Sequence, residues 1–139
     1  MDTIRRPLAV VLALITIAVA IHFIFQPFYT DTLNPNQVWE ILDWFMAFAV
    51  VVALVVTYMQ KRGIESGTTD TNRFISVNVA FYAAAWLAIW FFWNWFDNLS
   101  LGDELQGELR LTFWGLIDPL FIIVVGSVSA RLWKHESAD

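Results

Sequence analysis

Long runs of apolar residues, separated by short polar stretches, dominate the sequence. Four such runs cover roughly residues 7–27, 37–60, 74–97 and 111–133. Each is close to the about 20 residues that cross a hydrocarbon core ~30 Å thick as an α-helix. The sequence lacks the ten-residue alternating segments that are typical of membrane strands. The pattern therefore predicts an all-α integral membrane protein, with residues 1–139 forming a single domain, a compact bundle of four transmembrane helices.

The polar stretches between the runs are short. Asn34 and Pro35 form a turn and helix-start signal before the second run, and residues 61–73 and 98–110 are rich in glycine and polar residues. None is long enough to form a separate domain, so we expect function to reside in the bundle or on its faces. The runs show no internal repeat, which argues against an inverted-repeat transporter within one chain.

Composition supports the membrane interpretation. Hydrophobic residues make up 58% of the 139 residues and charged residues only 15%, against about 25% charged residues in soluble domains. Mean hydropathy is +0.59. The net charge of −5 and the lack of cysteine exclude a nucleic-acid partner and a disulfide scaffold. The expected partners are the lipid bilayer and either other membrane subunits or copies of the chain itself.

The distribution of basic residues predicts the orientation. Only Arg110 falls on one side of a four-span topology, beside loops that carry the acids Asp31, Asp103, Glu104 and Glu108. The other seven basic residues fall on the opposite side: Arg5, Arg6, Lys61, Arg62, Arg73, Arg131 and Lys134. Because basic residues favour the cytoplasmic side, both termini are expected in the cytoplasm. The membrane is expected to be the plasma membrane of a bacterium or archaeon. The first run also fits a signal peptide loosely, but it is long for one, so we interpret it as a retained span.

Small and aromatic residues suggest how the helices pack. Small side chains allow helices to approach closely in lipid, and they recur at helical spacing: Ala9, Ala13 and Ala20 in the first span, Ala80, Ala84 and Ala88 in the third, and Gly126 and Ala130 in the fourth. Trp86, Trp90 and Trp93 follow a second face of the third span. They form either a lipid-facing surface, a docking surface for another membrane subunit or one wall of a slot for an apolar ligand. Trp93 and Trp95 also fall where an aromatic belt is expected.

The ionisable residues inside the spans gather toward the non-cytoplasmic side. Glu40 and Asp43 share one face of the second span at i, i+3, Asp97 closes the third, and Asp118 lies about seven residues inside the fourth, or ~10 Å deep. Pro119 cannot donate a hydrogen bond to the Gly115 carbonyl. These four acids are candidates for an ion or proton site. Asp118 alternatively has a structural role, for example as a partner for Arg110, or contacts another subunit.

His22 offers a further possibility. With Glu40 and Asp43 it supplies one nitrogen and two carboxylates, which suits zinc, iron or copper by ligand type, although the spacing matches no metal motif. A hydrogen-bonded packing role explains His22 equally simply, and the two acids also suit the positive end of a helix dipole. No cofactor is identified. A haem would need two chains to share it through His22, whereas bound lipid is expected.

No complete catalytic constellation is present, and nothing resembles a nucleophile elbow, a phosphate loop or a zinc-binding helix. The small size and the tryptophan face favour an accessory or structural subunit of a larger membrane complex, such as an enzyme or transport assembly. The alternative is a homo-oligomeric small ion channel or proton-coupled transporter that uses Asp118, Glu40 and Asp43. A weaker alternative is a metal-binding or redox subunit.

Overall fold

The described part of the chain folds into four long helices. The structure is a computed structural model that describes residues 2–29, 32, 34–65, 70–101 and 108–134. Helix α1 spans Asp2–Phe25 and continues into a short 3₁₀ turn, η1, at Gln26–Phe28. It is followed by α2 (Pro35–Glu65), α3 (Thr71–Leu101) and α4 (Glu108–Lys134). All four helices are long and apolar enough to cross a membrane. This confirms the expectation of helices as the secondary structure and of four segments suited to span a membrane.

The helices extend beyond the predicted apolar runs because polar residues cap their ends. The Asn34 side-chain oxygen accepts a hydrogen bond from the Asn36 backbone N–H at 3.1 Å, and Pro35 begins α2, where a missing N–H costs nothing. The Asp70 carboxylate accepts a hydrogen bond from the Asn72 N–H at 3.1 Å, just before α3. Both are N-capping contacts, and they place each helix start a few residues before the first strongly apolar residue.

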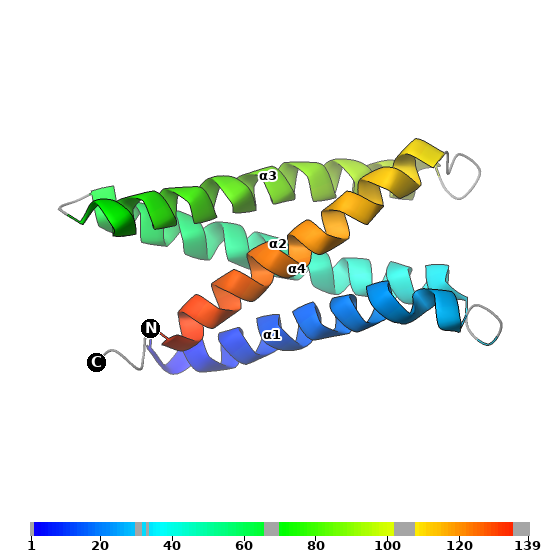
Figure 1. Ribbon diagram of the computed structural model, residues 1–139, viewed down its shortest axis with the longest axis horizontal. Helices are drawn as coiled ribbons and strands as arrows, with labels where there is room; N and C mark the ends of the chain where they lie inside the picture. The colour runs from blue at the N-terminus through cyan, green and yellow to red at the C-terminus, as the bar shows by residue number, and fades with distance from the viewer. Residues whose placement is uncertain (1, 30–31, 33, 66–69, 102–107, 135–139) are drawn as a thin grey trace.

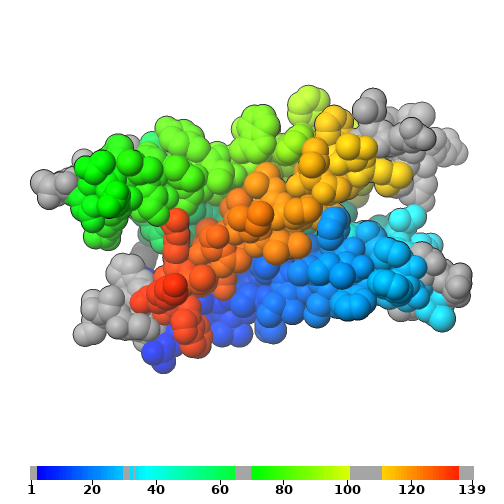
Figure 2. Space-filling view, in the orientation of Figure 1, coloured from blue at the N-terminus to red at the C-terminus, as the bar shows by residue number. Residues whose placement is uncertain are grey.

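The arrangement of the helices gives α4 the central position. Helices α1 and α4 pack extensively against each other, as do α2 and α3, and α4 also contacts both α2 and α3. Figure 1 shows α4 crossing diagonally from the end of α3 to the start of α1, and Figure 2 shows it running across the face between those two helices. The largest fully buried side chains include Phe91, Phe121, Leu12 and Met46.

The two ends of the bundle differ in charge. The start of α1, the end of α2, the start of α3 and the end of α4 lie at one end of the bundle, and the other helix ends lie at the opposite end (Figure 1). The seven basic residues grouped by the sequence all fall near the first of these ends, which we call the basic end. There the Arg131 guanidinium of α4 donates a hydrogen bond to the Ser76 hydroxyl of α3 at 3.1 Å. The acids Asp31, Asp103 and Glu104, predicted for the opposite side, lie outside the described residues.

Small residues bring α1 and α4 together. The Ser129 hydroxyl of α4 donates a hydrogen bond to the Ala9 carbonyl of α1 at 2.8 Å, and a Cβ added at Gly126 would lie 3.5 Å from Thr16 Cγ2. Ala9, Ala84 and Ala88 are buried, while Ala13, Ala20 and Ala80 are half-buried. Ala130 is exposed and lines a groove between α1 and α4, together with Ala13 and Gly126.

Candidate functional site

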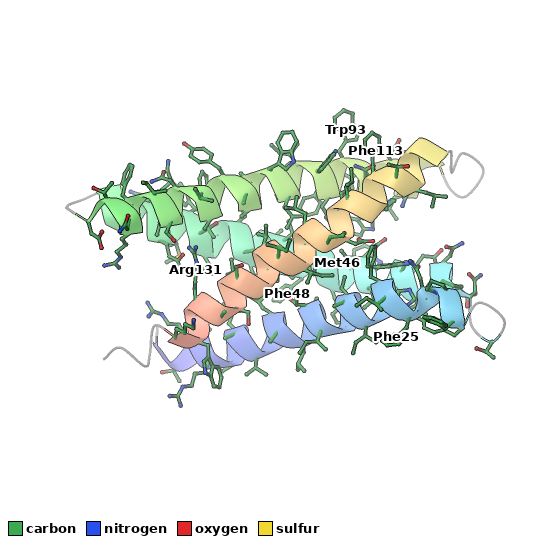
Figure 3. All side chains as sticks on the ribbon, viewed as in Figure 1. Phe25, Met46, Phe48, Trp93, Phe113 and Arg131 are labelled. Atoms are coloured by element: carbon green, nitrogen blue, oxygen red, sulfur yellow. The ribbon has the colours of Figure 1, made fainter. Side chains whose placement is uncertain are left out.

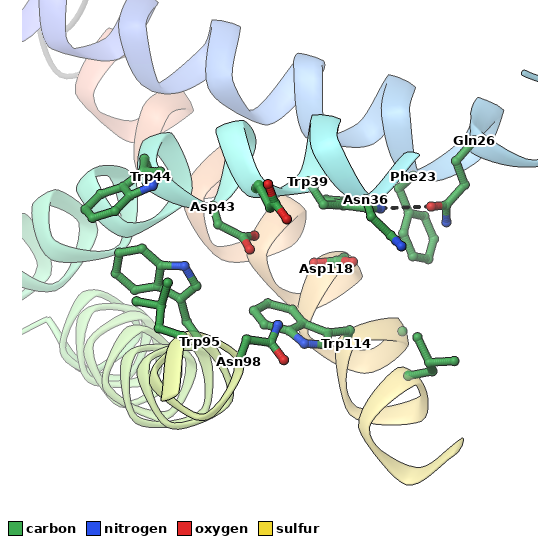
Figure 4. Close-up of a pocket in the computed structure, with 14 residues that line it drawn as sticks. Phe23, Gln26, Asn36, Trp39, Asp43, Trp44, Trp95, Asn98, Trp114 and Asp118 are labelled. Atoms are coloured by element: carbon green, nitrogen blue, oxygen red, sulfur yellow. Dashed lines mark hydrogen bonds between the residues drawn. The ribbon is translucent and has the colours of Figure 1, made fainter. Parts of the chain in front are cut away.

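The end of the bundle opposite the basic end contains a cavity of about 630 Å³ to which all four helices contribute. Among the described residues that line it, three are acids and none is basic. They are Phe23 and Gln26 from the first helix and its turn, Asn36, Trp39, Glu40, Asp43 and Trp44 from α2, Trp95, Asn98 and Leu99 from α3, and Leu111, Trp114, Gly115 and Asp118 from α4. Figure 4 shows this site. Its volume is that of a typical small-molecule pocket, roughly 300–1,000 Å³.

Helical spacing explains why α2 presents two acids to the cavity. Residues three and four positions apart lie on the same face of a helix, and Asn36, Glu40 and Asp43 follow that spacing. Glu40 is exposed, whereas only 8% of the Asp43 surface is accessible. The acids of α2 therefore run from the rim of the cavity toward its interior.

Asp118 provides the acid of α4, and it lies deepest. Only 4% of its surface is accessible, and its Oδ1 atom has no hydrogen-bond partner among the described residues. Its carboxyl group interacts electrostatically with that of Asp43, and the two side chains lie on opposite sides of the space between α2 and α4 (Figure 4). The Arg110 side chain, predicted as a structural partner of Asp118, lies outside the described residues, so that pairing stays a prediction.

Pro119 changes the backbone next to Asp118. It lies inside α4, and because proline has no N–H, the Gly115 carbonyl lacks its usual helical donor. Gly115 lines the cavity, and a Cβ added there would meet no atom within 4 Å. The cavity is therefore bordered by a carboxylate and by a backbone segment with one hydrogen bond fewer than a regular helix.

Tryptophan rings form much of the remaining wall, and their neighbours hold them in place. Trp95 is buried and meets Trp44 edge to face at 4.8 Å between ring centroids. The Trp39 indole N–H donates a hydrogen bond to the Gln26 side-chain oxygen at 2.8 Å. Trp114 packs edge to face against Phe91 at 5.8 Å, and its buried indole N–H has no acceptor among the described residues. The walls are thus rigid aromatic surfaces.

Comparison with known proteins assigns the chain to no family. No protein-family model, no curated protein and no solved structure matches it. The chemistry and geometry of the cavity are therefore the basis for a functional assignment.

The structure separates some candidates that the sequence grouped together. His22 is buried behind Trp39, with ring centroids 4.5 Å apart, and its Nδ1 shares a hydrogen bond with the Tyr29 hydroxyl. It does not line the cavity with Glu40 and Asp43, and within residues 2–134, where described, no three His, Cys, Asp or Glu side chains come close enough to hold a metal ion. Asp97, the fourth acid considered, lies on α3 and does not line the cavity.

The tryptophans singled out from the sequence lie elsewhere. Trp86 and Trp93 are 58% and 71% exposed, and Trp93 points away from the bundle (Figure 3). Trp90 is half-buried and packs between Trp86 and Phe113. They form an outer surface and not a wall of this cavity. Trp95, expected in an aromatic belt, is instead buried in the core, because its neighbours Phe91 and Trp44 enclose it.

Sequence reasoning missed the four tryptophans of the cavity. A signal was present, because Trp39 and Asp43 are four residues apart, as are Trp114 and Asp118. That spacing places a tryptophan and an acid on one helix face. A search for aromatic–acid pairs at i, i+4 would have found both walls.

Proposed function

We propose that this chain is an integral membrane protein that binds a cation or proton at the acidic cavity. As an assembly of several copies it acts as a small channel or proton-coupled transporter. The observation that carries the proposal is the state of Asp118: its carboxyl is almost fully buried, faces the cavity, and leaves Oδ1 without a partner among the described residues. A buried carboxylate is costly unless something compensates it, and a cation or proton in the cavity supplies that compensation.

The size of the bundle is the reason for invoking several copies. Four helices enclose too little space for a wide pore, and in the described part of the chain Phe91, Phe121 and Met46 are fully buried between them. Large apolar side chains are exposed along all four helices, which is the surface that either lipid or a second copy covers. A conducting path therefore needs either an interface between copies or movement of the helices.

We also propose that the basic end faces the cytoplasm, so that the cavity lies toward the outer leaflet. The support is the seven-to-one distribution of basic residues. Because the chain has no cysteine, a single cysteine introduced at Thr32 or at Lys134 reports orientation cleanly. In whole cells, a membrane-impermeant thiol reagent should label T32C and not K134C; the reverse pattern would overturn the orientation.

Flux through liposomes tests the proposed function. Purified protein reconstituted in liposomes should carry K⁺, Na⁺ or H⁺, and Asp118→Asn should reduce that flux by roughly tenfold or more, because each 1.4 kcal/mol lost from a charge interaction is about a factor of ten. Asp97→Asn is the matched control, since it removes an acid at the same end that does not line the cavity. Flux that is unchanged in Asp118→Asn would contradict the proposal.

A second candidate is an accessory subunit of a larger membrane complex. The exposed Trp86 and Trp93 favour it, since rigid aromatic side chains are enriched where proteins dock. The two candidates differ in what the isolated chain does. If the chain gives no flux in liposomes and is always purified from its native membrane with a stable partner, the accessory-subunit function is favoured over the transport function.

A further inference from the structure

The cavity combines two features that recognise the same kind of ligand. Its acids supply negative charge, and its indole rings supply the electron-rich faces that attract cations through their quadrupole. Trp39, Trp44, Trp95 and Trp114 come from three different helices and border one space with Asp43 and Asp118 (Figure 4). We propose that the cavity binds an organic cation, an ammonium group that carries alkyl substituents; this inference rests on the proposed function and names its ligand class.

The geometry disfavours a bare metal ion as the main ligand. Divalent ions such as Ca²⁺ require about six to eight oxygen ligands at short range, but no three acidic or histidine side chains among the described residues converge on one point. The cavity of about 630 Å³ also holds far more than one ion. Spread charges around an aromatic-walled space suit a large cation, whose charge is distributed over its alkyl groups.

Two unpartnered polar groups refine the ligand. The Asp118 Oδ1 atom is a buried acceptor without a donor, and the Trp114 indole N–H is a buried donor without an acceptor, within the part of the chain described. They lie four residues apart on one face of α4. A ligand with an ammonium centre and a nearby oxygen suits both groups. Its positive charge balances the Asp118 carboxylate by charge attraction, even where the nitrogen is fully alkylated and has no N–H, and its oxygen accepts a hydrogen bond from the Trp114 indole N–H. Choline has this combination, and so do the choline and ethanolamine headgroups of lipids.

Binding of choline by the full-length chain in lipid nanodiscs tests the inference. The nanodiscs are made of phosphatidylglycerol, which has no ammonium group, and the comparison ligand is 3,3-dimethyl-1-butanol, which replaces the choline nitrogen with carbon and is neutral. Titration calorimetry should show choline binding roughly tenfold or more tightly than the neutral analogue, because charge and cation–π contacts are both lost in the analogue. Equal affinity for the two ligands, or no binding of either, overturns the inference.

Variants locate the binding in the cavity. Asp118→Asn should weaken choline binding roughly tenfold, and Trp44→Leu should weaken it by about three- to tenfold, as expected for one cation–π contact. Trp44 is the mildest choice of tryptophan because it is largely exposed and still lines the cavity. Trp93→Leu, an exposed tryptophan outside the cavity, is the control. If Trp44→Leu and Trp93→Leu weaken binding equally, the aromatic walls do not hold the ligand and the inference fails.

The source of the ammonium group is tested by changing the lipid. If a lipid headgroup is the natural ligand, nanodiscs of phosphatidylcholine should occupy the site and abolish measurable choline binding; if a free cation is the ligand, affinity should be the same in both lipids. Either result supports an ammonium site. Flux of K⁺, Na⁺ or H⁺ that depends on Asp118, with no choline binding, would overturn this inference while leaving the proposed function intact. Choline binding without any flux of K⁺, Na⁺ or H⁺ would support the ammonium site and contradict the proposed transport function.

Discussion

Replacing Phe121 with alanine is expected to destabilise the folded protein by about 3 kcal/mol. Phe121 is fully buried on α4, which contacts each of the other three helices. Phenylalanine-to-alanine changes in cores cost about 3–5 kcal/mol, partly because the cavity they leave does not collapse. The lower part of that range applies here, because in lipid the gain comes from close packing rather than from removal of apolar surface from water.

Reversible unfolding in mixed micelles measures this effect. Ile123→Ala is the matched control, because Ile123 lies on the same helix only two residues away but is 65% exposed. It should change the free energy of unfolding by less than about 1 kcal/mol, as substitutions away from the core do. Similar losses for both variants would mean that α4 is not buried as the structure has it.

Replacing Asp118 with leucine is expected to stabilise the folded protein, in contrast to the replacement of Phe121 with alanine. The buried carboxyl leaves Oδ1 without a partner in the described part of the chain, and an aspartate at the centre of a span costs about 2.5–3.5 kcal/mol on insertion scales. Leucine is larger than aspartate, but it branches at the same atom, has no polar atoms, and has the cavity beside it to take the extra volume. Asp118→Leu should therefore raise the free energy of unfolding by roughly 2 kcal/mol. The same variant should lose Asp118-dependent flux.

The same unfolding assay separates a functional from a structural Asp118. A residue kept for ligand binding at the expense of stability gives a more stable but inactive protein when it is replaced. If Asp118 instead pairs with a structural partner such as Arg110, replacing Asp118 leaves that partner unpaired, and the protein becomes less stable. Asp118→Asn, which keeps the shape without the charge, should fall between the wild type and Asp118→Leu; a loss of stability in both variants would contradict the functional role.

Much of the fold follows from local patterns. The apolar runs predict the four helices, and Asn34 and Pro35 predict where α2 begins, because capping and a missing N–H act within one helical turn. The i, i+3 spacing of Glu40 and Asp43 likewise predicts that they share a face, since it depends only on helix geometry. In each case the signal and its structural result involve neighbouring residues.

The composition of the cavity depends on how the helices are rotated and crossed, which spacing alone does not determine. Trp86, Trp90 and Trp93 form a regular helical stripe, yet this stripe faces outward, while Trp95 on the same helix turns into the core. The diagonal course of α4 brings Asp118 to the acids of α2. The His22 ring packs against Trp39, and Trp39, not His22, lines the cavity. These outcomes are set by packing between distant segments.

Pro119 divides α4 into two parts with different attachments. The part after Pro119 packs against α1, with a hydrogen bond from Ser129 to the Ala9 carbonyl and a close approach of Gly126 to Thr16. The part before it borders the cavity through Leu111, Trp114 and Gly115. Because the backbone between them lacks one hydrogen bond, bending concentrates at this joint. If α4 bends, we therefore expect the bend to fall at Pro119, where a tilt of the first part would widen or narrow the cavity beside Asp118 without disturbing the contacts of the second part with α1.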